Sequence, residues 1–173
     1  AGEITASITN GSITAVKKSS GEYKARPSKK GKASVTLYTK IDDKRTKMGS
    51  VEFRVKEVPP PKARVPLAKK AGGVLMIEKT KMLNSGGVLA DLENFDFEGV
   101  RYIITSYRLT GMYKGEQMKR ETTNGGGFTK DMLNIIKNTK IGNTLTISNI
   151  KAKRVDIKNS KERQLDPLVL EIK

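Results

Sequence analysis

Apolar and polar residues alternate along most of this chain, and this period of two constrains the fold more than any other feature. It is typical of half-buried β-strands, because successive side chains of a strand point to opposite faces of the sheet. Turn-forming dipeptides such as Asn10-Gly11 and Ser20-Gly21 separate the alternating runs. Short strands at this spacing predict an antiparallel β-sandwich. The clearest runs are residues 4–8, 33–37, 51–55, 101–109, 145–147 and 168–172.

The alternation breaks at residues 58–66, where three adjacent prolines follow Val58. Prolines cannot donate hydrogen bonds to a sheet, and they favour the semi-rigid polyproline II conformation. We therefore predict an all-β chain of two consecutive β-sandwich (Ig-like) domains. The small Ig-like domain covers residues 1–57, the Pro-rich linker residues 58–66, and the larger C-terminal β-sandwich domain residues 67–173.

One stretch of the second domain departs from period two. Thr129 is a good N-cap residue, and Asp131 falls in the first turn, where its charge complements the helix dipole. The apolar residues that follow are spaced for one face of a helix. We predict a single short helix near residues 129–138 in the larger domain.

The composition excludes several classes of chemistry. The chain has no cysteine, histidine or tryptophan. Disulfides, thiolate nucleophiles and zinc sites built from His or Cys are therefore absent, and so is the commonest general base. No apolar run approaches the ~18 residues that a membrane span needs, and we expect any signal or anchor to lie upstream of Ala1. We predict no catalytic residues, no metal and no cofactor.

A glycine-rich loop precedes the predicted helix, at residues 124–130. Free N–H groups at such a place are able to hold a phosphate or a carboxylate. The loop lacks the spacing and the Lys-Ser/Thr end of a Walker loop, and it is not a GxGxxG motif within a βαβ unit. We favour a flexible connection between a strand and a capped helix.

One acidic cluster lies between residues 90 and 99. Calcium prefers several oxygen ligands, but the order of glycine and ligands in an EF-hand loop is missing here. The acids alternate with Leu92, Phe95 and Phe97, which favours an amphipathic strand over a metal site. The acidic residues are Asp91, Glu93, Asp96 and Glu98.

The chain is strongly basic, with 34 Lys and Arg against 18 Asp and Glu and a net charge of +16. The excess is spread over both domains, so it indicates a broad positive surface that attracts acidic partners such as proteins, nucleic acids, lipids or wall polymers. Basic residues gather in two stretches, residues 17–32 and residues 151–163. The first contains only Tyr23 and the second contains no aromatic residue for base stacking, which argues against nucleic acid. A solvated surface is the first interpretation, and docking on an acidic protein is the second. The candidate partner-binding residues are Lys29, Lys30, Lys32, Lys151, Lys153, Arg154 and Lys158.

Several segments, taken in order, resemble the C-terminal half of the PorM/GldM family. In the first domain they are Ile8–Ile13, Gly21–Pro27 and Met48–Lys56, which runs into the proline segment. No single segment is diagnostic, but their order covers nearly the whole chain. The segments of the second domain are Phe95–Phe97, Tyr102–Tyr107, Ile147–Ala152 and Leu168–Ile172.

The resemblance implies a non-enzymatic connector of type IX secretion and gliding motility. It implies a periplasmic homodimer, anchored in the inner membrane by an upstream helix. Such a shaft links an inner-membrane motor partner to ring proteins of the PorK/PorN or GldK/GldN type at the outer membrane. This fragment then forms the ring-facing end.

Three alternatives stay open. The first is a periplasmic β-sandwich module that binds wall polymer or carbohydrate, although nine aromatic residues leave few for a sugar groove. The second is a nucleic-acid-binding module, suggested by charge alone. The third is an unrecognised enzyme, which the missing His and Cys disfavour.

Overall fold

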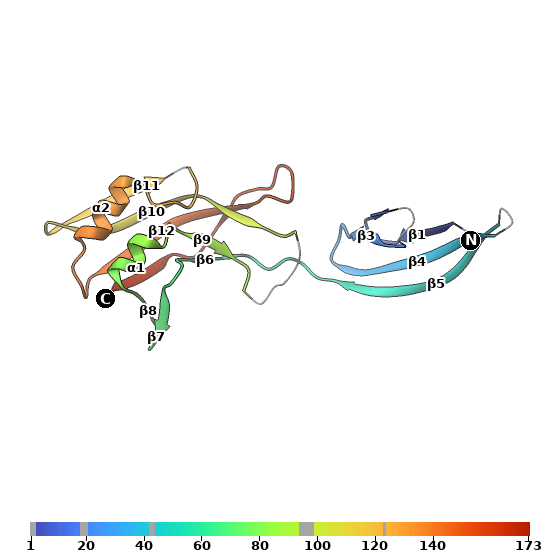
Figure 1. The fold of residues 1–173 in the computed structure, drawn as a ribbon, viewed down its shortest axis with the longest axis horizontal. Coiled ribbons are helices and arrows are strands. Elements are labelled where there is room, and N and C mark those ends of the chain that lie inside the picture. Colours follow the sequence, from blue (N-terminus) through green and yellow to red (C-terminus); the bar gives the residue numbers. More distant parts are fainter. Residues whose placement is uncertain (1–2, 18–20, 42–43, 94–98, 123) are drawn as a thin grey trace. The chain divides into compact units, whose positions relative to one another are not determined.

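The computed structural model describes residues 3–17, 21–41, 44–93, 99–122 and 124–173. The chain divides into two compact units, Ala1–Val58 and Pro59–Lys173 (Figure 1). Both units consist mainly of strands, and the second is larger and carries helices. The predicted all-β class is therefore confirmed.

The first unit contains two antiparallel sheets. Its three-stranded sheet has the order β1-β4-β5, and β2 pairs with β3 in a separate hairpin. A register shift between Leu37 and Tyr38 marks a bulge in the long β4–β5 ribbon. The strands are β1 (Ile4–Ile8), β2 (Ser12–Ala15), β3 (Tyr23–Arg26), β4 (Gly31–Ile41) and β5 (Lys44–Val55).

The first unit has very little buried apolar surface. Ala33 is the one buried hydrophobic residue among those that the structure describes in this unit. The alternation of residues 51–55 correctly predicts a strand, but half-burial is wrong for Val51 and Phe53, which are 59% and 53% exposed. The alternating pattern marks an apolar face, and nothing within the described part of the chain covers this end of it.

The second unit is built on a seven-stranded sheet. Its order is β11-β10-β12-β14-β8-β7, with β13 beside β12. All pairs are antiparallel except β14 with β8, which run parallel. A further pair, β6 and β9, forms a small separate sheet. The strands are β6 (Lys62–Arg64), β7 (Lys69–Ala71), β8 (Val74–Ile77), β9 (Leu89–Asp91), β10 (Tyr102–Tyr113), β11 (Glu116–Thr122), β12 (Thr144–Arg154), β13 (Arg163–Gln164) and β14 (Leu168–Ile172).

Two helices pack in this unit, α1 (Lys79–Asn84) and α2 (Lys130–Asn138). The predicted helix is α2, and the Thr129 hydroxyl caps it by accepting a hydrogen bond from the Met132 amide at 3.3 Å. The prediction of a single helix is wrong, because α1 is also present. This helix has only six residues and no side-chain N-cap hydrogen bond. Neither helix is long or apolar enough to cross a membrane, and the described residues form no other helix.

The core of the second unit lies between its sheet and α2. Leu109, Leu145 and Ile136 are each fully buried there. Gly111 on β10 makes this close packing possible, because a Cβ atom at this position would come within 2.6 Å of Ile135 on α2. We predicted a β-sandwich for this unit. The structure has one large sheet, accompanied by two helices and the small β6–β9 sheet.

Part of the predicted linker belongs to the second unit. Within residues 58–66, Lys62–Arg64 forms β6 and pairs with β9. Val65 follows it and is only 1% exposed. No strand forms over residues 56–61, which include the three prolines.

Candidate docking surfaces

The first basic stretch includes a loop that the Asn10 side chain holds in place. The Asn10 carbonyl oxygen accepts hydrogen bonds from the Lys29 amide at 3.0 Å and from the Ser28 amide at 3.3 Å. Its amide nitrogen donates to the Lys29 carbonyl at 2.7 Å and to the Lys32 carbonyl at 3.3 Å. The backbone that carries Lys29 and Lys30 is therefore fixed, while both side chains are exposed.

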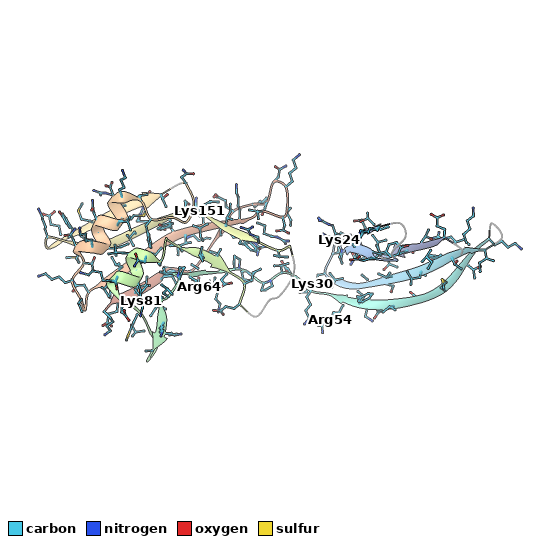
Figure 2. The ribbon with its side chains drawn as sticks, in the orientation of Figure 1. Lys24, Lys30, Arg54, Arg64, Lys81 and Lys151 are labelled. Atoms are coloured by element: carbon cyan, nitrogen blue, oxygen red, sulfur yellow. The ribbon has the colours of Figure 1, made fainter. Side chains whose placement is uncertain are left out.

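The structure places Arg54 beside a lysine of the first basic stretch. Lys32 on β4 lies opposite Arg54 on β5, and cross-strand partners point to the same face of a sheet. Lys32 itself forms an ion pair with Glu52 at 2.7 Å, which raises the pKa of the lysine. Arg54 is far from residues 29–32 in sequence, so only the strand register reveals it. We call Lys29, Lys30, Lys32 and Arg54 the loop patch. Figure 2 labels two of its members, Lys30 and Arg54.

The second basic stretch lies along β12. Lys151 and Lys153 are exposed and alternate with the buried residues Ile150 and Ala152, so they project from the side of the sheet opposite the core. Lys151 approaches Glu162 at 3.9 Å, which is a weak contact between exposed side chains. Lys158 is exposed in the loop that follows β12. We call Lys151, Lys153 and Lys158 the β12 patch.

Arg154 differs from its neighbours in this stretch. Its guanidinium makes two hydrogen bonds to the carboxylate of Asp156, one of them from Nε to Oδ1 at 3.0 Å. These bonds lower the pKa of Asp156 and raise the pKa of Arg154. The Arg154 side chain is only 18% exposed. Its charge is thus satisfied locally, and Arg154 joins neither patch.

The glycine-rich loop before α2 closes on a second pair of glycines. The Val88 amide donates to the Gly126 carbonyl at 2.8 Å, and the Phe128 amide donates to the Gly86 carbonyl at 3.2 Å. A Cβ atom at Gly87 would come within 2.0 Å of the Gly126 oxygen. We call this pair of glycine segments, residues 86–88 and 126–128, the glycine clasp. It requires glycine at Gly87, and the amides of Val88 and Phe128 donate to backbone carbonyls of the protein and not to a ligand.

The Tyr107 side chain contacts the glycine-rich loop through its hydroxyl and its ring. Its hydroxyl donates to the Gly127 carbonyl at 3.0 Å, and its ring meets Phe128 edge to face at 6.4 Å. Burial raises the pKa of Tyr107 well above its ordinary value. A neutral, hydrogen-bonded tyrosine in this position is structural.

The acidic cluster pairs with cations on the neighbouring strand. Lys62 meets Glu93 at 2.6 Å, and Arg64 meets Asp91 at 2.8 Å. Asp96 and Glu98 lie outside the described residues. Within the part of the chain that the structure describes, no three potential metal-ligating side chains come together.

Comparison with protein-family models gives two adjacent matches. Residues 1–56 match the GldM third domain, and residues 59–173 match the GldM C-terminal domain. No curated protein matches the chain. The two matched ranges follow one another in the order expected of consecutive domains and cover both compact units. The chain therefore belongs to the GldM family of gliding-motility and type IX secretion components, and it carries that family's third and C-terminal domains.

Proposed function

We propose that the chain is a non-enzymatic, periplasmic connector between the inner-membrane motor and the outer-membrane-associated ring of the type IX secretion machinery. In this proposal it acts as a homodimer and forms the ring-facing end, while an upstream part anchors it in the inner membrane. The observation that carries the proposal is the match of both units, in order, to GldM domains.

The charges of the described residues support a docking role. Lys29 and Lys30 have no ion-pair partner among the described residues, and the hydrogen bonds of Asn10 fix the backbone that presents them. A fixed backbone reduces the entropy that is lost when a partner binds. Positive side chains held in this way favour an acidic protein surface and raise the association rate.

The two patches offer separate contacts. The loop patch belongs to the first unit, and the β12 patch belongs to the second. Arg154 takes no part, because its guanidinium is bound to Asp156. We propose that acidic surfaces of the ring proteins bind the loop patch, the β12 patch or both.

The proposal is tested by measuring the affinity of the chain for purified ring proteins over a range of salt concentrations. We expect binding that weakens as ionic strength rises, since salt screens contacts between exposed charges. Lys29→Glu with Lys30→Glu should weaken binding by about tenfold or more, which corresponds to about 1.4 kcal/mol.

The matched control is Lys69→Glu with Lys70→Glu, an adjacent pair of exposed lysines on β7. It changes the net charge by the same amount, so an equal loss of affinity in both variants would mean that net charge alone attracts the ring. A chain that does not bind ring proteins at any salt concentration, but is retained on anionic wall polymer, would overturn the connector proposal in favour of a wall-binding module.

A further inference from the structure

A groove opens beside α2 in the second unit, where this helix packs against β10 and β11 (Figure 1). The groove has a volume of about 260 Å³. Pockets that enclose a whole drug-sized ligand measure ~300–1,000 Å³. The groove beside α2 therefore suits one small ring held at the surface.

Side chains of the sheet form one wall of the groove. Met118 on β11 pairs with Gly111, the residue that packs against α2. Arg120 pairs with the buried Leu109. Both side chains therefore lie on the face of the sheet that α2 covers. Tyr113 lies two residues beyond Gly111 on β10 and points to the same face.

The helix supplies the other wall. Asp131, Asn134 and Asn138 are spaced to lie on one side of α2, and all three side chains line the groove. Ile135 is only 4% exposed and gives the groove an apolar floor. We call the space between this wall and the wall of the sheet the α2 groove.

The protein itself uses only part of the polar groups in the α2 groove. The Asn138 amide nitrogen donates to the Asn134 backbone carbonyl at 2.8 Å, which leaves the Asn138 side-chain oxygen available. Within the described part of the chain, the side-chain amide of Asn134 and the hydroxyl of Tyr113 form no hydrogen bond. The groove therefore offers both donors and acceptors to a ligand.

The charges of the α2 groove cancel, unlike those of the chain as a whole. Arg120 and Asp131 approach each other at 3.5 Å, whereas the chain carries a net charge of +16. An anion in the groove would meet Asp131 as well as Arg120 and gains little. A metal ion would need more ligands, and the described residues bring no such group together. The groove therefore favours a neutral, polar ligand.

We infer that the α2 groove binds an N-acetylhexosamine unit of a glycan. The apolar face of such a sugar stacks on the Tyr113 ring, and its hydroxyl groups bond to Asn134 and Asn138 in place of water. The methyl of its acetamido group contacts Met118 and Ile135. This site goes beyond the connector role, because no residue of the groove belongs to the loop patch or the β12 patch.

One exposed lysine lies close to the stacking ring. The Lys114 ammonium is 5.5 Å from the centroid of the Tyr113 ring, near the ~6 Å limit of a cation–π contact. So loose a contact between exposed groups is easily displaced by a sugar. Lys114→Ala should therefore leave sugar binding within about twofold of wild type, which is ~0.4 kcal/mol or less.

The first test is a titration of the intact, isotope-labelled chain with triacetylchitotriose, followed by NMR. We expect saturable shifts at the amides of residues 113–120 and 131–138, with a dissociation constant of about 1 mM, because a small open groove binds weakly. Cellotriose lacks the acetamido groups and N-acetylalanine amide lacks the sugar ring, so each should bind at least about tenfold more weakly. Absent shifts, shifts centred elsewhere in the chain, or an equal response to either control would overturn the inference.

Variants locate the site independently. Tyr113→Ala, and separately Asn134→Ala with Asn138→Ala, should each weaken binding of the triose by about tenfold or more. The asparagines are exposed, so their variant decides the matter if Tyr113→Ala does not fold. The matched controls are Gln117→Ala, on the face of β11 that points away from α2, and Tyr38→Ala in the first unit. Losses in the controls as large as those in the groove variants would contradict the assignment.

Ionic strength separates this site from the basic patches. Binding of a neutral sugar should not change with salt, whereas contacts made by exposed lysines weaken. Affinity for the triose that falls steadily as salt rises would count against the α2 groove. The connector proposal is judged by ring binding alone, so the two proposals fail separately.

The source of the sugar is distinguished by sedimentation with insoluble peptidoglycan at high salt. Cosedimentation that the triose competes away, and that the variant Asn134→Ala with Asn138→Ala loses, assigns the site to the wall polymer. Binding of the triose without cosedimentation assigns it to another glycan that carries the same unit. Cosedimentation that the triose does not affect, from a chain that shows no shifts with the triose, would overturn the inference.

Discussion

The two units of this chain differ in how they bury apolar surface. In the second unit, the sheet and α2 enclose fully buried residues such as Leu109, Ile147 and Met132. In the first unit, Ala33 alone is buried among the described hydrophobic residues, and Leu37, Val51 and Phe53 are exposed. Both units are mainly β and both match GldM domains, so strand content does not tell whether a domain carries its own core.

In the connector role that we propose, this difference would divide the tasks between the two units. A unit with a complete core keeps its shape when it is isolated, so it suits the presentation of a fixed docking surface. A unit that relies on association becomes stable only within the assembly, because binding stabilises the folded state by mass action. The following predictions test whether the two units differ in this way.

The largest effect should come from truncating the same residue type in each unit. Leu109→Ala removes a fully buried side chain and should lower the free energy of unfolding of the second unit by about 3 kcal/mol. Leu37→Ala truncates a side chain that is 39% exposed and should cost less than about 1 kcal/mol in dilute protein. Urea denaturation followed by circular dichroism measures both.

Protein concentration sharpens this comparison. If association of the proposed homodimer covers Leu37, the loss of stability caused by Leu37→Ala grows as protein concentration rises, whereas the loss caused by Leu109→Ala stays constant. A large loss from Leu37→Ala at every concentration would mean that the first unit has a core of its own.

The glycine clasp should be the next most sensitive feature of the second unit. Gly87 has φ +147°, and an added Cβ would meet the Gly126 oxygen at 2.0 Å. Gly87→Ala should therefore cost about 3 kcal/mol, from backbone displacement together with conformational strain. The control Gly142→Ala, also at positive φ but with open space around it, should cost about 1 kcal/mol. Equal losses in thermal unfolding would show that the contact with Gly126 has no effect.

The cap of α2 should have a smaller effect. Thr129→Ala removes the acceptor for the Met132 amide and should destabilise the second unit by about 1 kcal/mol. Thr129→Ser keeps the hydroxyl and serves as the control, with a loss well below that of alanine. The melting temperatures of the two variants measure the difference, and identical values would argue that the cap does not matter.

The ion pairs should give the smallest effects, and the two units differ here as well. Arg154 and Asp156 should show a coupling of about 1 kcal/mol in a double-mutant cycle, because the pair is bidentate and partly buried. The pair Lys32–Glu52 is well exposed and should show no measurable coupling.

The effect of pH on this pair follows from the lowered pKa of Asp156. The contribution of the pair is complete above the ordinary carboxyl value of 3.8 and is lost as the pH falls through the lower folded-state pKa. Asp156→Asn should remove that part of the acid sensitivity. Acid titration of stability that is unchanged by Asp156→Asn would contradict this role.

Much of the fold is predictable from the sequence because it depends on local pattern. Alternation predicts β4, β5, β10 and β14, and the cap residue Thr129 predicts α2. The short helix α1 is missed, because six residues without a capping side chain carry little pattern. β6 is missed as well, because its partner β9 lies far along the chain.

The candidate surfaces are less predictable because they depend on contacts between distant residues. Composition identifies Lys29 and Lys30, but only the strand register brings Arg54 beside Lys32, and only the structure pairs Arg154 with Asp156. The exposed apolar residues Val51 and Phe53 are visible in the sequence as alternation at residues 51–55. The pattern indicates which face is apolar and does not indicate what covers it.

The most direct measurement is hydrogen exchange of backbone amides in the intact chain at several protein concentrations. We predict that protection of β10 and β12 in the second unit is independent of concentration, since their core is internal. Protection of β4 and β5 should rise with protein concentration as two copies of the proposed homodimer associate. Strong protection of β4 and β5 that does not change on dilution would contradict the view that the first unit depends on association for its stability.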